Sequence, residues 1–179
     1  MIQYETANSP FFEANKEYCE TIEGQLRTMD IACSGFCNSF GYDIEATLER
    51  DDLTYYLKFH KHQSTQNGVV IPVDAINYAG TKIEVSGLNK KFSLTAGKSN
   101  LKRLFTSKHF RDKIPAPYFV MCNYSPDSKF VDLLVKQILN YKISELTVHS
   151  GSAKGKMHIA ITNSLDLITD IERTMKALV

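Results

Sequence analysis

The fold is decided by residues 42–60, which read Tyr42-Asp43-Ile44-Glu45-Ala46-Thr47-Leu48-Glu49-Arg50-Asp51-Asp52-Leu53-Thr54-Tyr55-Tyr56-Leu57-Lys58-Phe59-His60. Apolar side chains alternate with mostly polar ones on both sides of the Arg50-Asp51-Asp52 turn. Because successive side chains of a strand point to opposite faces, this period of two predicts an antiparallel hairpin. One face of the hairpin is expected to be buried and the other to face water.

The residues before this hairpin have a helical period instead. Ser9 and Pro10 are typical of a helix start, where serine caps and proline loses no useful donor. A seam of mostly apolar side chains then follows at alternating three- and four-residue spacings. Its members are Phe12, Asn15, Cys19, Ile22, Leu26, Met29, Cys33, Phe36 and Phe40. This spacing predicts one long amphipathic helix over 9–39, closed by Gly41, which either packs on its own sheet or projects as an arm.

The rest of the chain predicts two more hairpins, a strand and three shorter helices. One hairpin pairs 82–87 with 92–95, and the other joins 146–149 to 156–161. The helices are expected over 99–113, after Ser125-Pro126-Asp127, and over 165–178. The sequence therefore predicts a single α+β domain over residues 1–179. Its core is a mainly antiparallel sheet of five to seven strands built from hairpins, on which the long N-terminal helix and the three shorter helices pack.

The formal net charge of +1 is the sum of three unlike segments. Residues 1–52 carry 11 acidic and 3 basic side chains, residues 53–123 carry 3 acidic and 11 basic ones, and residues 124–179 carry 6 acidic and 7 basic ones. The first two segments therefore contribute −8 and +8. Such a separation bears on partners and self-association rather than on the fold. The opposite charges can neutralise each other within the fold, between copies or against a partner.

The basic charge is densest over residues 89–113, where eight Lys or Arg residues stand against one Asp. We expect the binding residues to be Lys90, Lys91, Lys98, Lys102, Arg103, Lys108 and Arg111. Such a surface suits an acidic protein partner or the phosphates of a nucleic acid. Single-stranded nucleic acids also require exposed aromatic rings. Because Phe105 falls on the predicted inward face with Leu101 and Leu104, an acidic protein is the favoured partner.

Metal and catalytic patterns are weak. His60 and His62 share one strand face, and with Cys33 and Cys37 they would make four zinc ligands. However, Lys58 lies on the same face as the histidines and opposes a cation, so His60 and His62 remain only weak metal candidates. Gly97-Lys98-Ser99 resembles the end of a phosphate-binding loop, but Phe92 stands where that loop needs a glycine. We expect no catalytic residues and no cofactor.

These observations predict a non-catalytic cytoplasmic binding or adaptor module, able to self-associate, with a basic surface around 89–113 for an acidic partner. The location follows from four cysteines read as reduced thiols and from the lack of a signal peptide. No apolar run is long enough for a membrane helix, so no membrane partner is expected. A nucleic-acid-binding protein is the alternative. A small enzyme is a weaker one, and it would need His60, His149, His158 or Cys122 together in a pocket.

Overall fold

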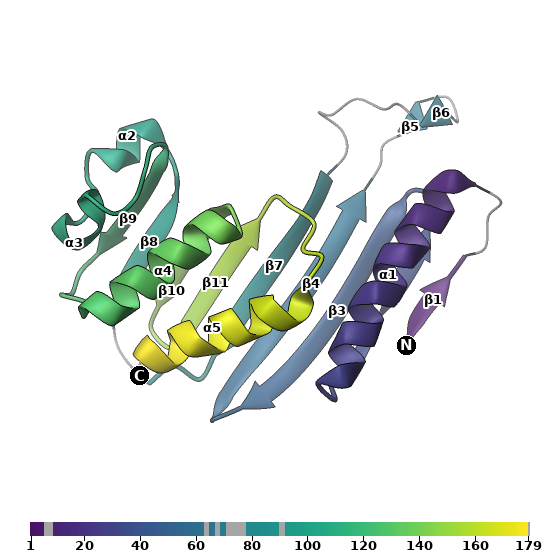
Figure 1. Ribbon diagram of the computed structural model, residues 1–179, viewed down its shortest axis with the longest axis horizontal. Helices are drawn as coiled ribbons and strands as arrows, with labels where there is room; N and C mark the ends of the chain where they lie inside the picture. Colours follow the sequence, from purple (N-terminus) through teal and green to yellow (C-terminus); the bar gives the residue numbers. More distant parts are fainter. Residues whose placement is uncertain (6–8, 63–64, 67–68, 71–77, 90–91, 179) are drawn as a thin grey trace.

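A nine-stranded mixed sheet runs through the computed structural model, in the order β1-β2-β3-β4-β7-β11-β10-β8-β9 (Figure 1). The structure describes residues 1–5, 9–62, 65–66, 69–70, 78–89 and 92–178. The strands of this sheet are β1 (Ile2–Tyr4), β2 (Cys33–Asn38), β3 (Gly41–Arg50), β4 (Leu53–His62), β7 (Tyr78–Ser86), β8 (Ser93–Lys98), β9 (Tyr118–Cys122), β10 (Ile143–His149) and β11 (Ser152–Met157). Two short strands, β5 (Thr65–Gln66) and β6 (Val69–Val70), pair separately.

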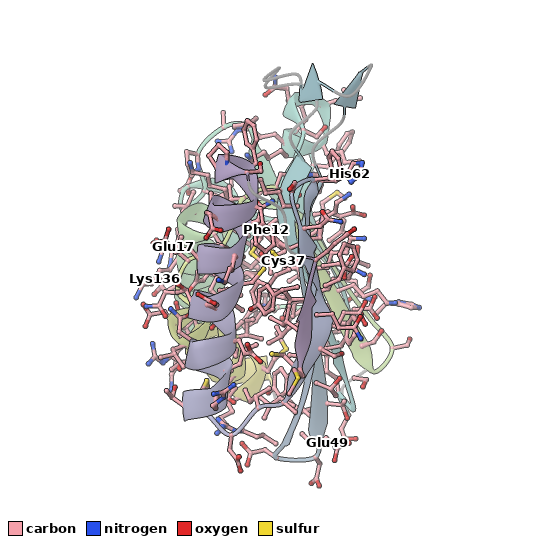
Figure 2. The ribbon with its side chains drawn as sticks, turned by 90° about the vertical axis from the view of Figure 1, so that its right-hand side faces the viewer. Phe12, Glu17, Cys37, Glu49, His62 and Lys136 are labelled. Atoms are coloured by element: carbon pink, nitrogen blue, oxygen red, sulfur yellow. The ribbon has the colours of Figure 1, made fainter. Side chains whose placement is uncertain are left out.

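The helices lie on one face of the sheet or at one of its ends. Helices α1 (Pro10–Thr28), α4 (Ser128–Asn140) and α5 (Ser164–Leu178) cover one face, and α2 (Asn100–Arg103) and α3 (Lys108–Arg111) lie beside β9 (Figure 1). Figure 2 shows the sheet from its edge, with Phe12 and Cys37 between α1 and the strands. The α+β class is confirmed. The sheet has nine strands rather than five to seven, and β1 pairs with β2 in parallel.

The hairpin of residues 42–60 is confirmed as β3 and β4. Ile44, Leu57 and Phe59 are buried under the helices, as the alternation requires. On the other face, Lys58 Nζ lies 2.9 Å from Asp43 Oδ1 and 2.8 Å from Glu45 Oε1. These ion pairs lie on the face of the sheet that no described helix covers, which agrees with the predicted wet face.

The expected helix over 9–39 is wrong beyond residue 28. Its start is confirmed, because Ser9 Oγ accepts a hydrogen bond from the Phe11 N–H and Pro10 opens α1. The helix ends where Asp30 takes a left-handed backbone with φ of 60°. The N–H groups of Asp30 and Ile31 then donate to the carbonyls of Arg27 and Leu26, a common way of closing a helix.

The seam continued past this point only by coincidence. Cys33, Phe36 and Phe40 fit the helical spacing, but Cys33 and Phe36 belong to β2, and both Phe36 and Phe40 are exposed. Within α1 the seam is real, since Phe12, Cys19, Ile22 and Leu26 are buried against the sheet. The helix therefore packs on its own sheet and is not a projecting arm.

The expected hairpin of 82–87 with 92–95 is also wrong. Both strands exist as β7 and β8, but β7 pairs with β4 and β11, and β8 pairs with β10 and β9. The hairpin of β10 and β11 lies between them in the sheet. That hairpin is confirmed with a tighter turn than expected, at Ser150 and Gly151, which both have positive φ.

The two long C-terminal helices are confirmed and pack against the sheet and each other. In α4 the cap is Asp127, whose Oδ1 accepts from the Phe130 N–H, while Ser125 lies before the helix. Phe130, Leu134 and Ile138 are buried on its inner face. Gln137 donates to the Asp170 carbonyl and to the Thr174 hydroxyl, which ties α4 to α5.

Candidate interaction surface

The predicted helix over 99–113 is divided into two short helices. Ser99 Oγ accepts from the Lys102 N–H and starts α2, as expected. The N–H groups of Leu104, Phe105 and Thr106 then bond three residues back instead of four, and the α-helix stops. Thr106 is buried, and α3 begins after Ser107. The missed signal was Thr106-Ser107, since hydroxyl residues favour caps and turns over helix interiors.

The connection between α2 and α3 covers the outer edge of β9. Arg103 Nη1 donates to the carbonyls of Tyr118 (3.0 Å) and Ile114 (2.8 Å). The Ser107 N–H donates to the Val120 carbonyl, and Ser107 Oγ accepts from the Cys122 N–H at 3.0 Å. An open strand edge invites pairing with other chains, so these bonds protect it. Arg103, expected as a binding residue, thus has a structural role that the sequence did not predict.

Three large apolar side chains of this region face water. Leu101 is 71% exposed, Leu104 is 73% exposed and Phe105 is 68% exposed. We expected all three on the inward face of one helix, and this is wrong. The inward positions are taken by Phe110 and Ile114, which are buried, while Leu104 and Phe105 lie in the turn that follows Arg103.

Exposed cationic side chains lie close to these apolar ones in the sequence. Lys98, Lys102, Lys108 and Arg111 are all exposed. Lys98 Nζ lies 5.2 Å from the centre of the Tyr118 ring, and Lys102 Nζ lies 5.4 Å from that of Phe119. Among the described residues from 98 to 113, the recorded ion pair is Lys113 with Asp132, so most of this charge faces solvent. We call these four cations with Leu101, Leu104 and Phe105 the α2–α3 surface; Lys90 and Lys91 lie outside the described residues.

The sheet separates the four residues of the possible zinc site. His60 lies opposite Asp43, and His62 lies opposite Gly41, on the uncovered face. Cys37 lies opposite Tyr42, and both are buried on the face that α1 covers. Cys33 lies four positions before Cys37 on β2, so its side chain is on the same face of the sheet as that of Cys37. No group of three metal-binding side chains occurs in the described part of the chain.

The residues considered for an enzyme do not all come together. His60 lies opposite Gly80, whose neighbour Thr81 lies opposite Met157, so His60 and His158 are near each other, whereas His149 and Cys122 lie elsewhere. His149 pairs with Ser152, six positions before His158, which directly follows β11, so the two residues lie roughly 20 Å apart along the strand direction. Cys122 is on β9 at the end of the sheet and donates its thiol hydrogen to the Tyr124 carbonyl at 3.3 Å. His60 is half-buried on β4, and its pKa is lowered from 6.5 by burial and by the nearby charge of Lys82.

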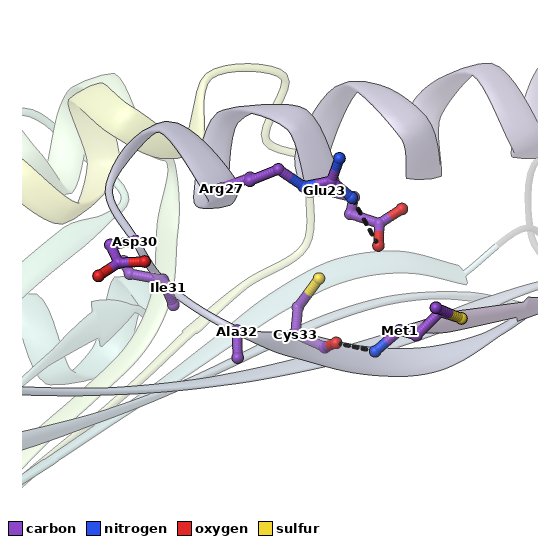
Figure 3. Close-up of a pocket in the computed structure, with 7 residues that line it drawn as sticks. All are labelled: Met1, Glu23, Arg27, Asp30, Ile31, Ala32 and Cys33. Carbon is purple, nitrogen blue, oxygen red and sulfur yellow. Dashed lines mark hydrogen bonds and ion pairs between the residues drawn. The ribbon is translucent and has the colours of Figure 1, made fainter.

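A shallow pocket of about 310 Å³ lies at the other end of the molecule, between the C-terminal end of α1 and β2 (Figure 3). Its lining includes Glu23 and Arg27, whose charged atoms are 3.6 Å apart, and Met1, whose amino group donates to the Cys33 carbonyl at 2.5 Å. Glu23, Arg27 and the amino group of Met1 therefore have partners within the lining, which also includes Asp30. The α2–α3 surface is the stronger candidate because its charges face solvent.

No described helix is long and apolar enough to cross a membrane. Comparison of the chain with family models, with curated proteins and with solved structures found no match in any of the three.

Proposed function

We propose that this chain is a non-catalytic cytoplasmic binding or adaptor module that holds an acidic protein segment on its α2–α3 surface. The observation that carries the proposal is the exposure of Leu101, Leu104 and Phe105 close in sequence to Lys98, Lys102, Lys108 and Arg111, for which no ion pair is found within the part of the chain that the structure describes. Contiguous exposed apolar side chains with a polar rim are typical of protein interaction sites. The proposed location rests on the four free cysteines.

Apolar and charged groups have separate tasks in this proposal. Covering the three apolar side chains supplies affinity, at roughly 25 cal/mol per Å² of apolar surface removed from water. Lys102, Lys108 and Arg111 select an acidic partner and speed its approach, an effect that salt weakens. The fitting ligand is therefore an acidic helical segment with an apolar or small-residue face beside its carboxylates, against which Leu101, Leu104 and Phe105 can lie.

The proposal is tested with a fluorescent acidic amphipathic helical peptide, titrated with the protein while anisotropy is recorded. A second peptide has the same charge but serine in place of each apolar residue. We expect the first peptide to bind and Leu104→Asp to weaken it by at least about ten-fold, equivalent to 1.4 kcal/mol. The matched control is Leu139→Asp, at an exposed leucine of α4. Equal binding of both peptides, or an equal effect of both substitutions, would contradict the proposal.

A nucleic-acid-binding module is the second candidate, because Phe105 is an exposed aromatic ring among lysines. Base stacking on a ring contributes about 1–3 kcal/mol per base. Phe105→Leu keeps an apolar side chain but removes the ring. If a labelled single-stranded oligonucleotide binds the wild type and Phe105→Leu weakens it several-fold while peptide binding persists, nucleic acid becomes the favoured ligand. The exposed leucines have no task in that mode, and so the protein partner ranks first.

A further inference from the structure

The acidic residues 1–30 and the basic residues 98–113 lie at opposite ends of the sheet. Strand β1 and helix α1 are at one end, and β9 with α2 and α3 is at the other (Figure 1). Nine strands at a spacing of about 4.8 Å place these ends roughly 38 Å apart. Residues 1–30 carry six acidic and two basic side chains, whereas residues 98–113 carry one acidic and six basic ones. No ion pair among the described residues joins these two segments, so they do not neutralise each other within one chain.

The basic end cannot pair well with the same surface of another copy. A two-fold interface brings identical patches together. Lys102, Lys108 and Arg111 of one copy would then face the same cations of the other. Such opposition of like charges costs several kcal/mol. A second copy can meet the α2–α3 surface only through a different, acidic part of the molecule.

Helix α1 provides such a part on its outer side. Glu13, Glu17 and Glu20 are exposed and follow one another at four- and three-residue spacing, so they form one stripe. Figure 2 shows Glu17 pointing away from the sheet. In the described part of the chain, the recorded ion pair of this stripe is Glu20 with Lys16, at 3.9 Å and exposed. The carboxylates of Glu13 and Glu17 are therefore available for ion pairs with a partner.

Short side chains beside this stripe leave room for apolar anchors. Ala14, Thr21 and Gly24 are exposed on the same outward half of α1. A Cβ added at Gly24 would meet no atom within 4 Å, so the helix surface is open there. Leucine and phenylalanine side chains from another copy can lie against this part of the helix while their neighbouring lysines reach the carboxylates.

We propose that the partner of the α2–α3 surface is a second copy of this chain, bound through the outer face of α1. The inference rests on the proposed function and adds the identity of the partner. Each copy has one basic end and one acidic end, so the contact is head-to-tail. Repetition of such a contact produces a ring or an open chain of molecules.

The test uses light scattering of the full chain and two variants with one blocked end each. Leu104→Ser with Phe105→Ser blocks the basic end, and Glu13→Gln with Glu17→Gln blocks the acidic end. All four substitutions are at exposed positions and create no charge. We expect the wild-type mass to rise above 20.3 kDa across about a hundred-fold range of concentration in about 0.02 M salt, and to return toward it in about 0.5 M salt.

Each variant alone is expected to stay monomeric. Their equimolar mixture should form dimers and stop there, because one intact end of each kind remains and the other ends are blocked. Leu139→Ser and Glu49→Gln, at exposed positions elsewhere, are the matched controls and should associate like the wild type. A wild type that stays monomeric in low salt, or a mixture that forms no dimer or grows beyond it, overturns the inference. Retained peptide binding in that case leaves the proposed function standing, whereas loss of both overturns both.

Discussion

Gly24 shows how a single residue of α1 limits stability without serving packing. It lies within the helix on the exposed side, and an added Cβ would have free space. Glycine costs about 1 kcal/mol relative to alanine in a helix interior. We therefore expect Gly24→Ala to raise the free energy of unfolding by about 0.5–1 kcal/mol, measured by urea denaturation.

The same substitution at Gly35 is the contrasting control. Its φ is 156°, and an added Cβ would lie 2.0 Å from the Asp43 carbonyl oxygen. Gly35→Ala should therefore destabilise the protein. A destabilising effect of Gly24→Ala would mean that α1 is packed differently from the arrangement described.

His60 makes the stability depend on pH. Its folded-state pKa lies below 6.5 because burial disfavours the charged imidazole and Lys82 repels it, although Asp43 acts in the opposite direction. Above pH 6.5 the ring is neutral in both states, and it has no effect. As the pH falls below 6.5, the unfolded chain binds the proton first, and stability is lost until the folded pKa is passed.

We therefore expect His60→Gln to lose less free energy of unfolding than the wild type between pH 7 and pH 5. The measurement is a urea denaturation series across that range. His62→Gln, at an exposed position two residues further along β4, controls for replacing a histidine in this strand. An unchanged pH slope in His60→Gln would show that burial of this ring does not oppose its protonation.

At the scale of elements, the local signals in the sequence were sufficient for the β3–β4 hairpin, the start of α1 and the two C-terminal helices. They failed at the end of α1, because Asp30 closes the helix where a glycine is more usual, and because Phe36 and Phe40 fit the helical period by chance. The separation of β7 and β8 is set by pairing with strands distant in the sequence, which local patterns do not encode.

For a similar reason, the sequence predicted the cations of the candidate surface but not its exposed apolar side chains. The cations were found by their density, but the exposure of Leu104 and Phe105 depends on the turn after Arg103. Helical spacing alone assigns both side chains to the core. That turn is held in place by contacts with β9, which follows it in the chain.

Arg103 allows the covering of the β9 edge to be tested. Arg103→Ala removes the two hydrogen bonds to the carbonyls of Ile114 and Tyr118. Hydrogen bonds to a charged group contribute about 1.5–3 kcal/mol, so we expect a loss of about that size in the free energy of unfolding. Hydrogen exchange should also become faster in residues 104–114.

Lys102→Ala is the matched control, since its ammonium lies over the Phe119 ring at the surface. It should cost at most about 1 kcal/mol. If the two substitutions destabilise the protein equally, Arg103 does not stabilise the covering of the β9 edge. Its guanidinium is then again a candidate binding group.

For the whole molecule, the order of the strands turns a charge pattern in the sequence into a spatial one. The acidic residues 1–30 and the basic residues 98–113 are held at opposite ends of one sheet. The molecule is therefore strongly dipolar although its net charge is close to zero. Its association should depend steeply on salt concentration. On the uncovered face of the sheet, by contrast, ion pairs join Lys58 to Asp43 and Glu45, and Lys154 to Glu84.

The central claim is that the α2–α3 surface is the binding surface, and it is tested most directly by mapping backbone amide NMR shifts while the acidic amphipathic peptide is added. The account predicts that the amides of residues 98–111 shift in a saturable way, and that those of β3 and β4 do not. Leu104→Asp should abolish these shifts. Saturable shifts confined to the uncovered face of the sheet, or none at residues 98–111, would contradict the account.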